Sequence, residues 1–190
     1  MRVLIAEDEA LIRMDLREML EEDGHEVVGE ARNGQEAVDM ARALAPDIVF
    51  MDIEMPVRTG IEAACEIGDE AIAPIVMVTA FSQAGYVEDA CNAGAMAYIV
   101  KPFAKHDIVP AMHLAVSRFA ETRALAGEVA DLNERLETRK VLDRAKGVLM
   151  EQGLSEPEAF KRLQRLAMDK RRSLKEIAEA VLLTAEIQQD

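Results

Sequence analysis

The segment "DIVFMDIEMPVRTG", residues 47–60, contains an apolar run, IVFM (48–51), which is followed directly by the acidic residue Asp52. Four other short runs have a similar character: RVLIA (2–6), HEVVGE (25–30), PIVMVTA (74–80) and MAYIVK (96–101). Runs rich in Val and Ile, several of them almost continuously apolar, are typical of strands buried on both faces of a parallel sheet. The five runs therefore predict the five strands of one sheet.

Helical patterns separate these predicted strands, over residues 9–22, 34–44, 60–70 and 83–93. Gly24 and Gly94 follow the first and the last of them, where a glycine commonly ends a helix. Connections of this length are too long for hairpins and suit crossovers between parallel strands. The alternation predicts an α/β fold with a doubly wound, five-stranded parallel sheet.

Composition restricts the class of protein further. Half of the 190 residues are hydrophobic, but no stretch reaches the roughly 20 apolar residues of a membrane span. The first ten residues, MRVLIAEDEA, place three acids directly after a short apolar run, which does not fit a signal peptide. The two cysteines, Cys65 and Cys91, lack metal-binding or redox spacing. We expect a cytoplasmic protein with reduced thiols and no membrane contact.

The charge is distributed unevenly along the chain, whose formal net charge is −14. Residues 1–120 contain 22 acidic and 9 basic side chains, whereas residues 135–175 contain 12 basic and 6 acidic ones. Such asymmetry indicates two parts with different partners, and the basic part favours a polyanion.

The C-terminal third reads as helical. One helix is expected from Lys105 to about Gln152, with its only proline, Pro110, in the first turn. Two further helices are predicted by the capping-box pairs Ser155–Glu158 and Ser173–Glu176. The sequence therefore predicts a long helix that leads into an all-α three-helix bundle.

Four apolar residues of the long helix recur at spacings of 4, 3 and 4: Leu125, Val129, Leu132 and Leu136. This pattern is typical of a short coiled-coil seam, and it predicts a homodimer through residues 119–136. The alternative is that the four side chains face the N-terminal domain.

Functional groups of a doubly wound sheet gather where its strands end. Glu7 and Asp8 follow the first predicted strand, and Asp52, Thr79 and Lys101 stand at the ends of the third, fourth and fifth. Converging carboxylates favour a hard divalent cation such as Mg²⁺. A lysine and a hydroxyl beside them suit a phosphoryl group that a carboxylate could accept. Each acid taken alone is more simply a solvated loop residue or a helix cap.

Four segments carry a family resemblance: AEDE (6–9), MDIEMPVRTG (51–60), VTA (78–80) and YIVKPF (98–103). Through them, residues 1–118 resemble the receiver domain of bacterial two-component response regulators. The resemblance implies a flavodoxin-like fold and a phosphoprotein that is not a dedicated enzyme. The acidic pair is Glu-Asp rather than Asp-Asp, which the family tolerates.

The same resemblance implies roles for the site residues. Asp52 accepts phosphoryl from a sensor histidine kinase, and Mg²⁺ is held by Glu7, Asp8, Asp52 and the main-chain carbonyl of Glu54. Thr79 and Tyr98 form a switch pair. The implied phosphoryl-contact and switch residues are Thr79, Ala80, Tyr98, Lys101 and Pro102, with a cis bond before the proline.

In the basic part, Arg135, Arg139 and Lys146 fall within about 40° of one another on a helix. An apolar arc beside them, which includes Ala145 and Leu149, is expected to pack on the next two helices. The basic stripe is expected to stay exposed. Phe160 is assigned to the apolar core face of the second helix.

The segment from Arg139 to Leu182 resembles the ANTAR domain, an RNA-binding output module of transcription antiterminators. This resemblance implies a domain over residues 137–190 that binds paired RNA hairpins as a dimer, formed on phosphorylation, and so affects RNA polymerase indirectly. The candidate RNA-binding residues are Arg135, Arg139, Lys146, Gly147, Arg165, Arg171 and Arg172.

Two alternatives remain for the C-terminal part. The stretch SLKEIAEAV (173–181) resembles the first helix of a helix-turn-helix, but the nine residues after it, LLTAEIQQD, are too short for a recognition helix. A DNA-binding output is therefore disfavoured, and an output that binds only protein stays open. Because Phe160 is the one aromatic residue there, base stacking is expected to fall to arginines.

Overall fold

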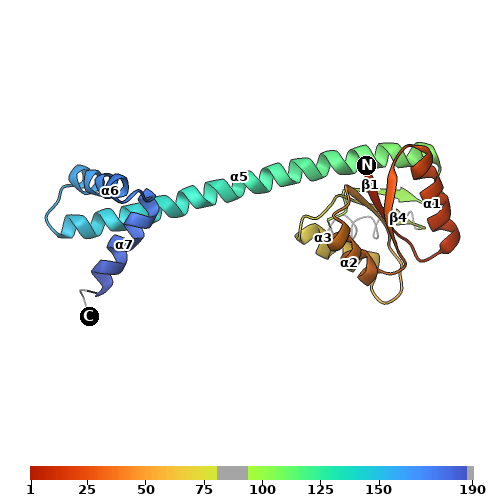
Figure 1. Ribbon diagram of the computed structural model, residues 1–190, viewed down its shortest axis with the longest axis horizontal. Coiled ribbons are helices and arrows are strands. Elements are labelled where there is room, and N and C mark those ends of the chain that lie inside the picture. Colours follow the sequence, from red (N-terminus) through yellow and green to blue (C-terminus); the bar gives the residue numbers. More distant parts are fainter. Residues whose placement is uncertain (81–93, 188–190) are drawn as a thin grey trace. The chain divides into compact units, whose positions relative to one another are not determined.

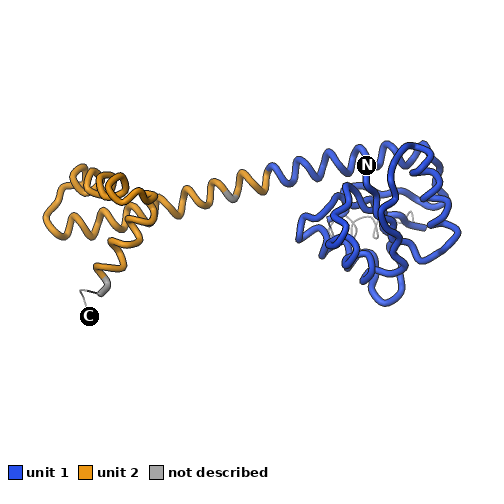
Figure 2. Tube along the Cα trace, in the orientation of Figure 1, with its two compact units in different colours: residues 1–124 blue, residues 125–190 orange. Residues whose placement is uncertain are grey.

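The computed structural model describes residues 1–80 and 94–187. The helix predicted over residues 83–93, with Cys91, lies outside the described residues. The chain divides into two compact units, Met1–Ala124 and Leu125–Asp190, which are coloured separately in Figure 2. Each unit is described by itself below.

Unit 1 contains a five-stranded parallel sheet (Figure 1). Its strands are β1 (Arg2–Ala6), β2 (Glu26–Ala31), β3 (Ile48–Asp52), β4 (Ile75–Thr79) and β5 (Ala97–Val100), in the order β2-β1-β3-β4-β5. Every residue of β3 and β4 is buried, as their nearly continuous apolar sequences predicted. The doubly wound fold is thus confirmed.

Helices cover both faces of this sheet. Helices α2 (Gly34–Leu44) and α3 (Gly60–Asp69) pack on one face, and α1 (Ala10–Glu22) packs on the other, together with the start of α5 (Lys105–Glu151). Because alternate strand residues point to opposite faces, Met51 joins the first core and Phe50 the second. The strand ends are left as the edge where polar groups can meet.

A glycine fixes the start of α3 against the end of β3. The Gly60 N–H donates to the carbonyl oxygen of Ile53 at 2.9 Å. A Cβ atom at Gly60 would lie 1.7 Å from the main-chain oxygen of Asp52, which is far inside van der Waals contact. Only glycine allows this approach, and it places α3 directly behind the acidic strand end.

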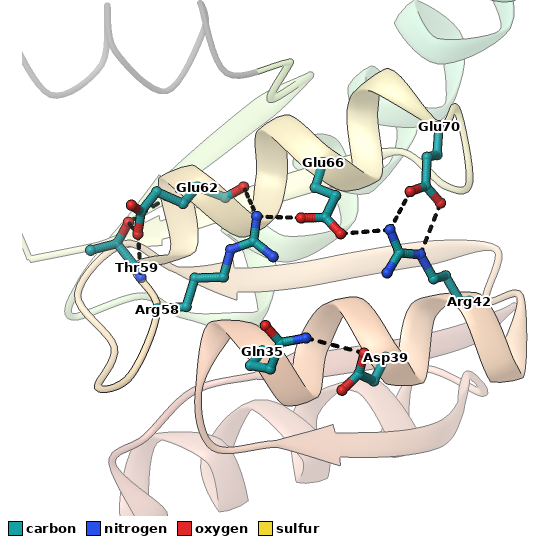
Figure 3. Close-up of polar contacts among 8 residues, drawn as sticks. All are labelled: Gln35, Asp39, Arg42, Arg58, Thr59, Glu62, Glu66 and Glu70. Carbon is teal, nitrogen blue, oxygen red and sulfur yellow. Dashed lines mark hydrogen bonds and ion pairs between the residues drawn. The ribbon is translucent and has the colours of Figure 1, made fainter.

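The capping residues of α3 belong to a polar network that joins it to α2 (Figure 3). Thr59 and Glu62 form a capping box, in which the Thr59 N–H donates to the Glu62 carboxylate at 3.0 Å. The Arg42 side chain on α2 bonds to Glu66 and Glu70 on α3. These exposed ion pairs help to fix the position of α3 against α2. Because exposed pairs are individually weak, the buried apolar residues beneath them supply most of the folding stability.

The predicted place of Pro110 in the first turn of the long helix is wrong. Helix α5 begins at Lys105, and Pro110 lies inside it. The Asp107 carboxylate accepts from the Ala104 N–H at 2.9 Å and so caps the helix at its predicted start, which leaves Pro110 in the second turn. Although α5 has 47 residues, no described helix is both long and apolar enough to cross a membrane.

Unit 2 is built from the C-terminal part of α5 with α6 (Glu156–Lys170) and α7 (Leu174–Ile187). Five buried residues from all three helices form its core: Ala145, Leu149, Ala159, Leu163 and Ala178. Both predicted capping boxes are present, since the N–H groups of Ser155 and Ser173 donate to Glu158 and Glu176 at 2.9 and 2.8 Å. The predicted three-helix bundle is confirmed.

Candidate functional site

The predicted acidic site forms a pocket at the carboxyl edge of the sheet. Asp52 ends β3 and Thr79 ends β4, while Glu7 and Lys101 directly follow β1 and β5. The cavity has a volume of about 330 Å³ and is lined by Asp8, Glu9, Asp52, Ile53, Glu54, Thr79, Ala80 and Lys101. The topology therefore brings together residues that are up to 94 positions apart, from Glu7 to Lys101.

Lys101 is the central cation of this pocket. Its Nζ lies 2.7 Å from Glu7 Oε2 and 3.1 Å from Asp52 Oδ1. Glu7 and Asp52 are 1% and 6% exposed, whereas Asp8 is exposed to solvent. Two buried carboxylates thus share one ammonium group, and the pocket carries an excess of negative charge.

In this pocket the pKa values of both Asp52 and Lys101 are raised. Burial, followed by the charge of Glu7, raises the pKa of Asp52 to about 6, although Lys101 acts in the opposite direction. Burial also lowers the pKa of Lys101, but its bonds to Glu7 and Asp52 outweigh this effect, so that the net shift is upward. Lys101 is therefore charged at neutral pH. Its single positive charge compensates the ionised Asp52 carboxylate only in part, because Glu7 contacts the same ammonium group.

The residues present fit a hard divalent cation. One carboxylate oxygen from each of Glu7, Asp8 and Asp52 lies within 4.8 Å of the others. Glu7 Oε2 is buried, and the Lys101 ammonium 2.7 Å away, which compensates it, is shared with Asp52. Carboxylate oxygens of this kind are the ligands that Mg²⁺ or Ca²⁺ prefers. The pocket can therefore hold such an ion. Its positive charge would neutralise the negative charge of the three carboxylates that Lys101 leaves uncompensated.

The remaining predicted pocket residues separate into two groups. Ala80 and Glu54 line the pocket with Thr79, which is 2% exposed. Tyr98 is 50% exposed and lines a different cavity, of about 620 Å³, beside α5. The Lys101–Pro102 bond is cis, as the resemblance implied. The structure thus brings Thr79 to the acidic residues and leaves Tyr98 outside the lining of their pocket.

Sequence reasoning missed Arg13 on α1, which supports the acidic loop. Its Nη1 donates to the main-chain oxygens of Glu7 and Asp8, at 2.7 and 3.3 Å, and its Nε donates to Glu30 at 3.2 Å. Only 8% of Arg13 is exposed. Helix α1 contains two arginines, Arg13 and Arg17, and an arginine in a helix with many charged residues is usually solvated, so the pattern gave no signal that Arg13 turns inward.

A second candidate site lies on unit 2, where the predicted basic stripe borders a groove of about 500 Å³. Arg135, Arg139 and Lys146 line it, as their shared helical face predicted, and Phe160 of α6 joins them. The other lining residues are Glu134, Thr138, Leu142 and Asp143. The groove therefore combines cations, carboxylates and one aromatic ring.

Two predictions about this groove are wrong. Phe160 is 38% exposed instead of buried, whereas Ala159 and Leu163 of the same helix are fully buried in the core. Lys146 is not an exposed cation, since only 19% of its side chain is accessible. Its Nζ lies 2.8 Å from Asp143 and 2.9 Å from Glu156, and these carboxylates raise the pKa of Lys146.

The other proposed nucleic-acid contacts lie outside the lining of this groove. Arg165 and Arg171 are exposed, and the exposed Arg172 pairs with Glu176 at 3.0 Å. A Cβ atom at Gly147 would meet no atom within 4 Å. Packing within this chain therefore does not require a glycine there.

Comparison with known proteins identifies a family for each of the two units. The model of the response regulator receiver domain matches residues 3–113, and the model of the ANTAR domain matches residues 130–182. The response regulator domain of Thermotoga maritima CheB has the same fold, with a TM-score of 0.57 and 32% identity. That alignment covers 62% of this chain and 96% of the CheB domain chain.

Relatives in sequence extend the match. The chemotaxis protein CheY of Thermotoga maritima is 45% identical over 113 residues, which are 59% of this chain and 94% of CheY. The transcriptional regulatory protein PdtaR of Mycobacterium tuberculosis is 62% identical over 184 residues, or 96% of this chain and 90% of PdtaR. The chain therefore belongs to the two-component response regulators, as a transcriptional regulator that joins a receiver domain to an ANTAR domain.

Proposed function

We propose that this protein is a phosphorylation-controlled antiterminator: a sensor histidine kinase phosphorylates Asp52, and the C-terminal domain binds RNA hairpins. The observation that carries the first half is the buried Asp52 carboxylate, which shares the Lys101 ammonium with Glu7 in an open acidic pocket. The acceptor is modified stoichiometrically, so the protein is not a dedicated enzyme.

In the proposed transfer, an Asp52 oxygen attacks the phosphorus of a phosphohistidine, and the bond from phosphorus to the imidazole nitrogen breaks. Lys101 then turns from the Asp52 carboxylate to a phosphoryl oxygen, and the Thr79 hydroxyl donates to another. Mg²⁺ bound by Glu7, Asp8, Asp52 and the Glu54 carbonyl would neutralise charge on the phosphoryl oxygens. Arg13 holds the loop that carries two of these ligands.

The surface beside the pocket supports a protein as the phosphoryl donor. Leu11 and Met14 on α1 are 76% and 63% exposed. A cavity of about 350 Å³ lies between α1 and the segment after β5, where Pro102 and Phe103 line it. Exposed apolar side chains around a functional pocket are typical of a docking surface.

The proposed output is RNA binding by unit 2. Arg135 and Arg139 are 73% and 82% exposed, and within the described part of the chain they pair with carboxylates of their own helix, Asp131 and Asp143. Exposed pairs of this kind are weak, so both guanidinium groups can exchange them for phosphates. Hairpin binding would stabilise an antiterminator RNA structure, and the effect on RNA polymerase would be indirect.

We expect Arg139→Gln to weaken hairpin binding and to reduce the slope of log affinity against log salt by about 0.7 to 0.9, because one phosphate is no longer neutralised. The measurement is filter binding of the full chain at several salt concentrations, with Mg²⁺ and a phosphodonor. Arg123→Gln makes the same charge change on α5 within unit 1 and should leave the slope unchanged.

Two outcomes would contradict RNA binding. If duplex DNA competes as well as hairpin RNA, the output is a DNA-binding module. If neither nucleic acid binds, with or without the phosphodonor, the helical bundle is a protein-binding module.

We further propose that phosphorylation favours a homodimer through the apolar seam of α5. Leu125, Val129, Leu132 and Leu136 are between 51% and 62% exposed. Their spacing places them on one stripe of the helix, as in a coiled coil. A second copy of the same stripe would bury all eight side chains.

Replacing Val129 and Leu132 together by Glu should therefore raise the dimer dissociation constant about 100-fold or more, since burying unpaired charges is costly. Light scattering with a phosphodonor measures the effect. Ser117→Glu with Ala124→Glu adds the same charge at exposed positions off the seam and should leave dimerisation intact. Dimerisation of the seam variant at the wild-type concentration would place the interface elsewhere; the next candidate is the part of the receiver around the helix predicted over residues 83–93, which lies outside the described residues.

A further inference from the structure

We propose that the groove bordered by Phe160, Arg135, Arg139 and Lys146 is a subsite for one unpaired nucleobase of an RNA loop, which stacks on the Phe160 ring. This inference rests on the proposed RNA-binding function. It goes further by assigning a base-binding site to a residue that the sequence pattern placed in the core.

The exposure of Phe160 is the first observation. It is 38% exposed and lines the groove, although the adjacent Ala159 and the nearby Leu163 are fully buried. A phenylalanine has no polar group that would favour this position, so the bundle itself gains little from the exposed part of the ring. Aromatic rings in cationic grooves are the usual stacking platforms for single-stranded nucleic acids.

The walls of the groove suit the backbone on either side of such a base. Arg135 and Arg139 stand one turn apart on α5 and are largely exposed, so they can contact successive phosphates. The groove volume of about 500 Å³ lies within the range of small-molecule sites. The net charge of residues 135–175 is also positive, with 12 basic and 6 acidic side chains. This charge favours an anionic nucleic-acid strand as the ligand.

Lys146 supplies a fixed polar group for the edge of the base. Its ammonium carries three N–H donors, of which Asp143 and Glu156 can occupy two. The third is available for a base oxygen or ring nitrogen, and Asp143 offers a carboxylate acceptor beside it. Because Lys146 is mostly covered and doubly paired, it would bind with little loss of side-chain entropy.

The test compares Phe160→Leu with Phe160→Tyr in the full chain, on hairpin RNA with a phosphodonor and Mg²⁺. Phe160→Leu keeps an apolar side chain but removes the ring, and affinity should fall about 5- to 150-fold, the value of one stacked base. Phe160→Tyr should bind like the wild type. The salt slope should be unchanged in both, because neither variant removes a phosphate contact.

A loop substituted with 2-aminopurine at one position at a time gives an independent readout. In the wild type, one position should be quenched on binding, and Phe160→Leu should lose that quenching. Met168→Leu, at a 72% exposed position of the same helix outside the groove lining, should change neither affinity nor quenching.

The outcomes separate this inference from the function on which it rests. If the wild type binds no hairpin, the proposed RNA-binding function fails. If the wild type binds but Phe160→Leu binds equally well, or if no loop position responds to binding, the stacking subsite is wrong while RNA binding stands. Should Phe160→Leu lose its helical circular dichroism, the 2-aminopurine pattern of the wild type and of Phe160→Tyr decides the question.

Discussion

Asp52→Asn should reduce phosphoryl uptake to background and, without Mg²⁺ at pH 7 to 8, should stabilise the protein by about 1 to 3 kcal/mol. The amide cannot form the acyl phosphate, which explains the first effect. The second follows because burial and Glu7 disfavour the ionised carboxylate, as its raised pKa of about 6 indicates. Incorporation of label from acetyl phosphate measures the first effect, and urea unfolding measures the second.

The stability difference should depend on pH in a defined direction. Asp52 has a pKa of about 6 in the folded protein, above the ordinary value of 3.8, so the folded state holds its proton more tightly. This contribution favours folding below pH 4 and is lost as the pH rises through 6. The advantage of Asp52→Asn should therefore be small at pH 4 and reach its full value above pH 7.

Mg²⁺ and a matched variant provide the controls. Mg²⁺ should raise the melting temperature of the wild type more than that of Asp52→Asn, which lacks one carboxylate ligand. Asp69→Asn, at an exposed position of α3, should retain phosphoryl uptake. Uptake by Asp52→Asn equal to that of the wild type would show that another residue is the acceptor.

Gly60→Ala should destabilise the receiver unit by about 3 kcal/mol or more and should also impair phosphoryl uptake. The added Cβ would lie 1.7 Å from the Asp52 main-chain oxygen, so α3 and the end of β3 must separate. Because a Cβ atom is fixed to the backbone of α3 and the atom it meets is a main-chain oxygen of the packed strand β3, no side-chain rotation can relieve the contact. Urea unfolding and label incorporation measure the two effects.

Gly127→Ala is the matched control on α5. A Cβ atom there meets nothing within 4 Å, so the substitution should stabilise the helix by about 0.5 to 1 kcal/mol and leave uptake unchanged. If Gly60→Ala were as stable as the wild type, the close approach of α3 to Asp52 would be incorrect.

The sequence by itself determined the sheet, the described helices on its two faces and the acidic pocket. Apolar runs and helical spacing identify the elements, and parallel strands bring their carboxyl ends to one edge. The meeting of Glu7, Asp52 and Lys101 therefore follows from strand topology alone. The capping boxes at Ser155 and Ser173 were equally predictable, because both partners lie three residues apart in the chain.

Only the tertiary structure decided which side chains near a helix face are covered. Ala159 and Phe160 are adjacent in sequence, yet the small residue enters the core and the ring remains in the groove. Lys146 is mostly covered, and one of the two carboxylates that hold its ammonium group, Glu156, belongs to the next helix. Arg13 turns inward because β2 presents Glu30 beside the acidic loop. In each case the deciding contact is with another element, at a distance that periodicity along one helix cannot encode.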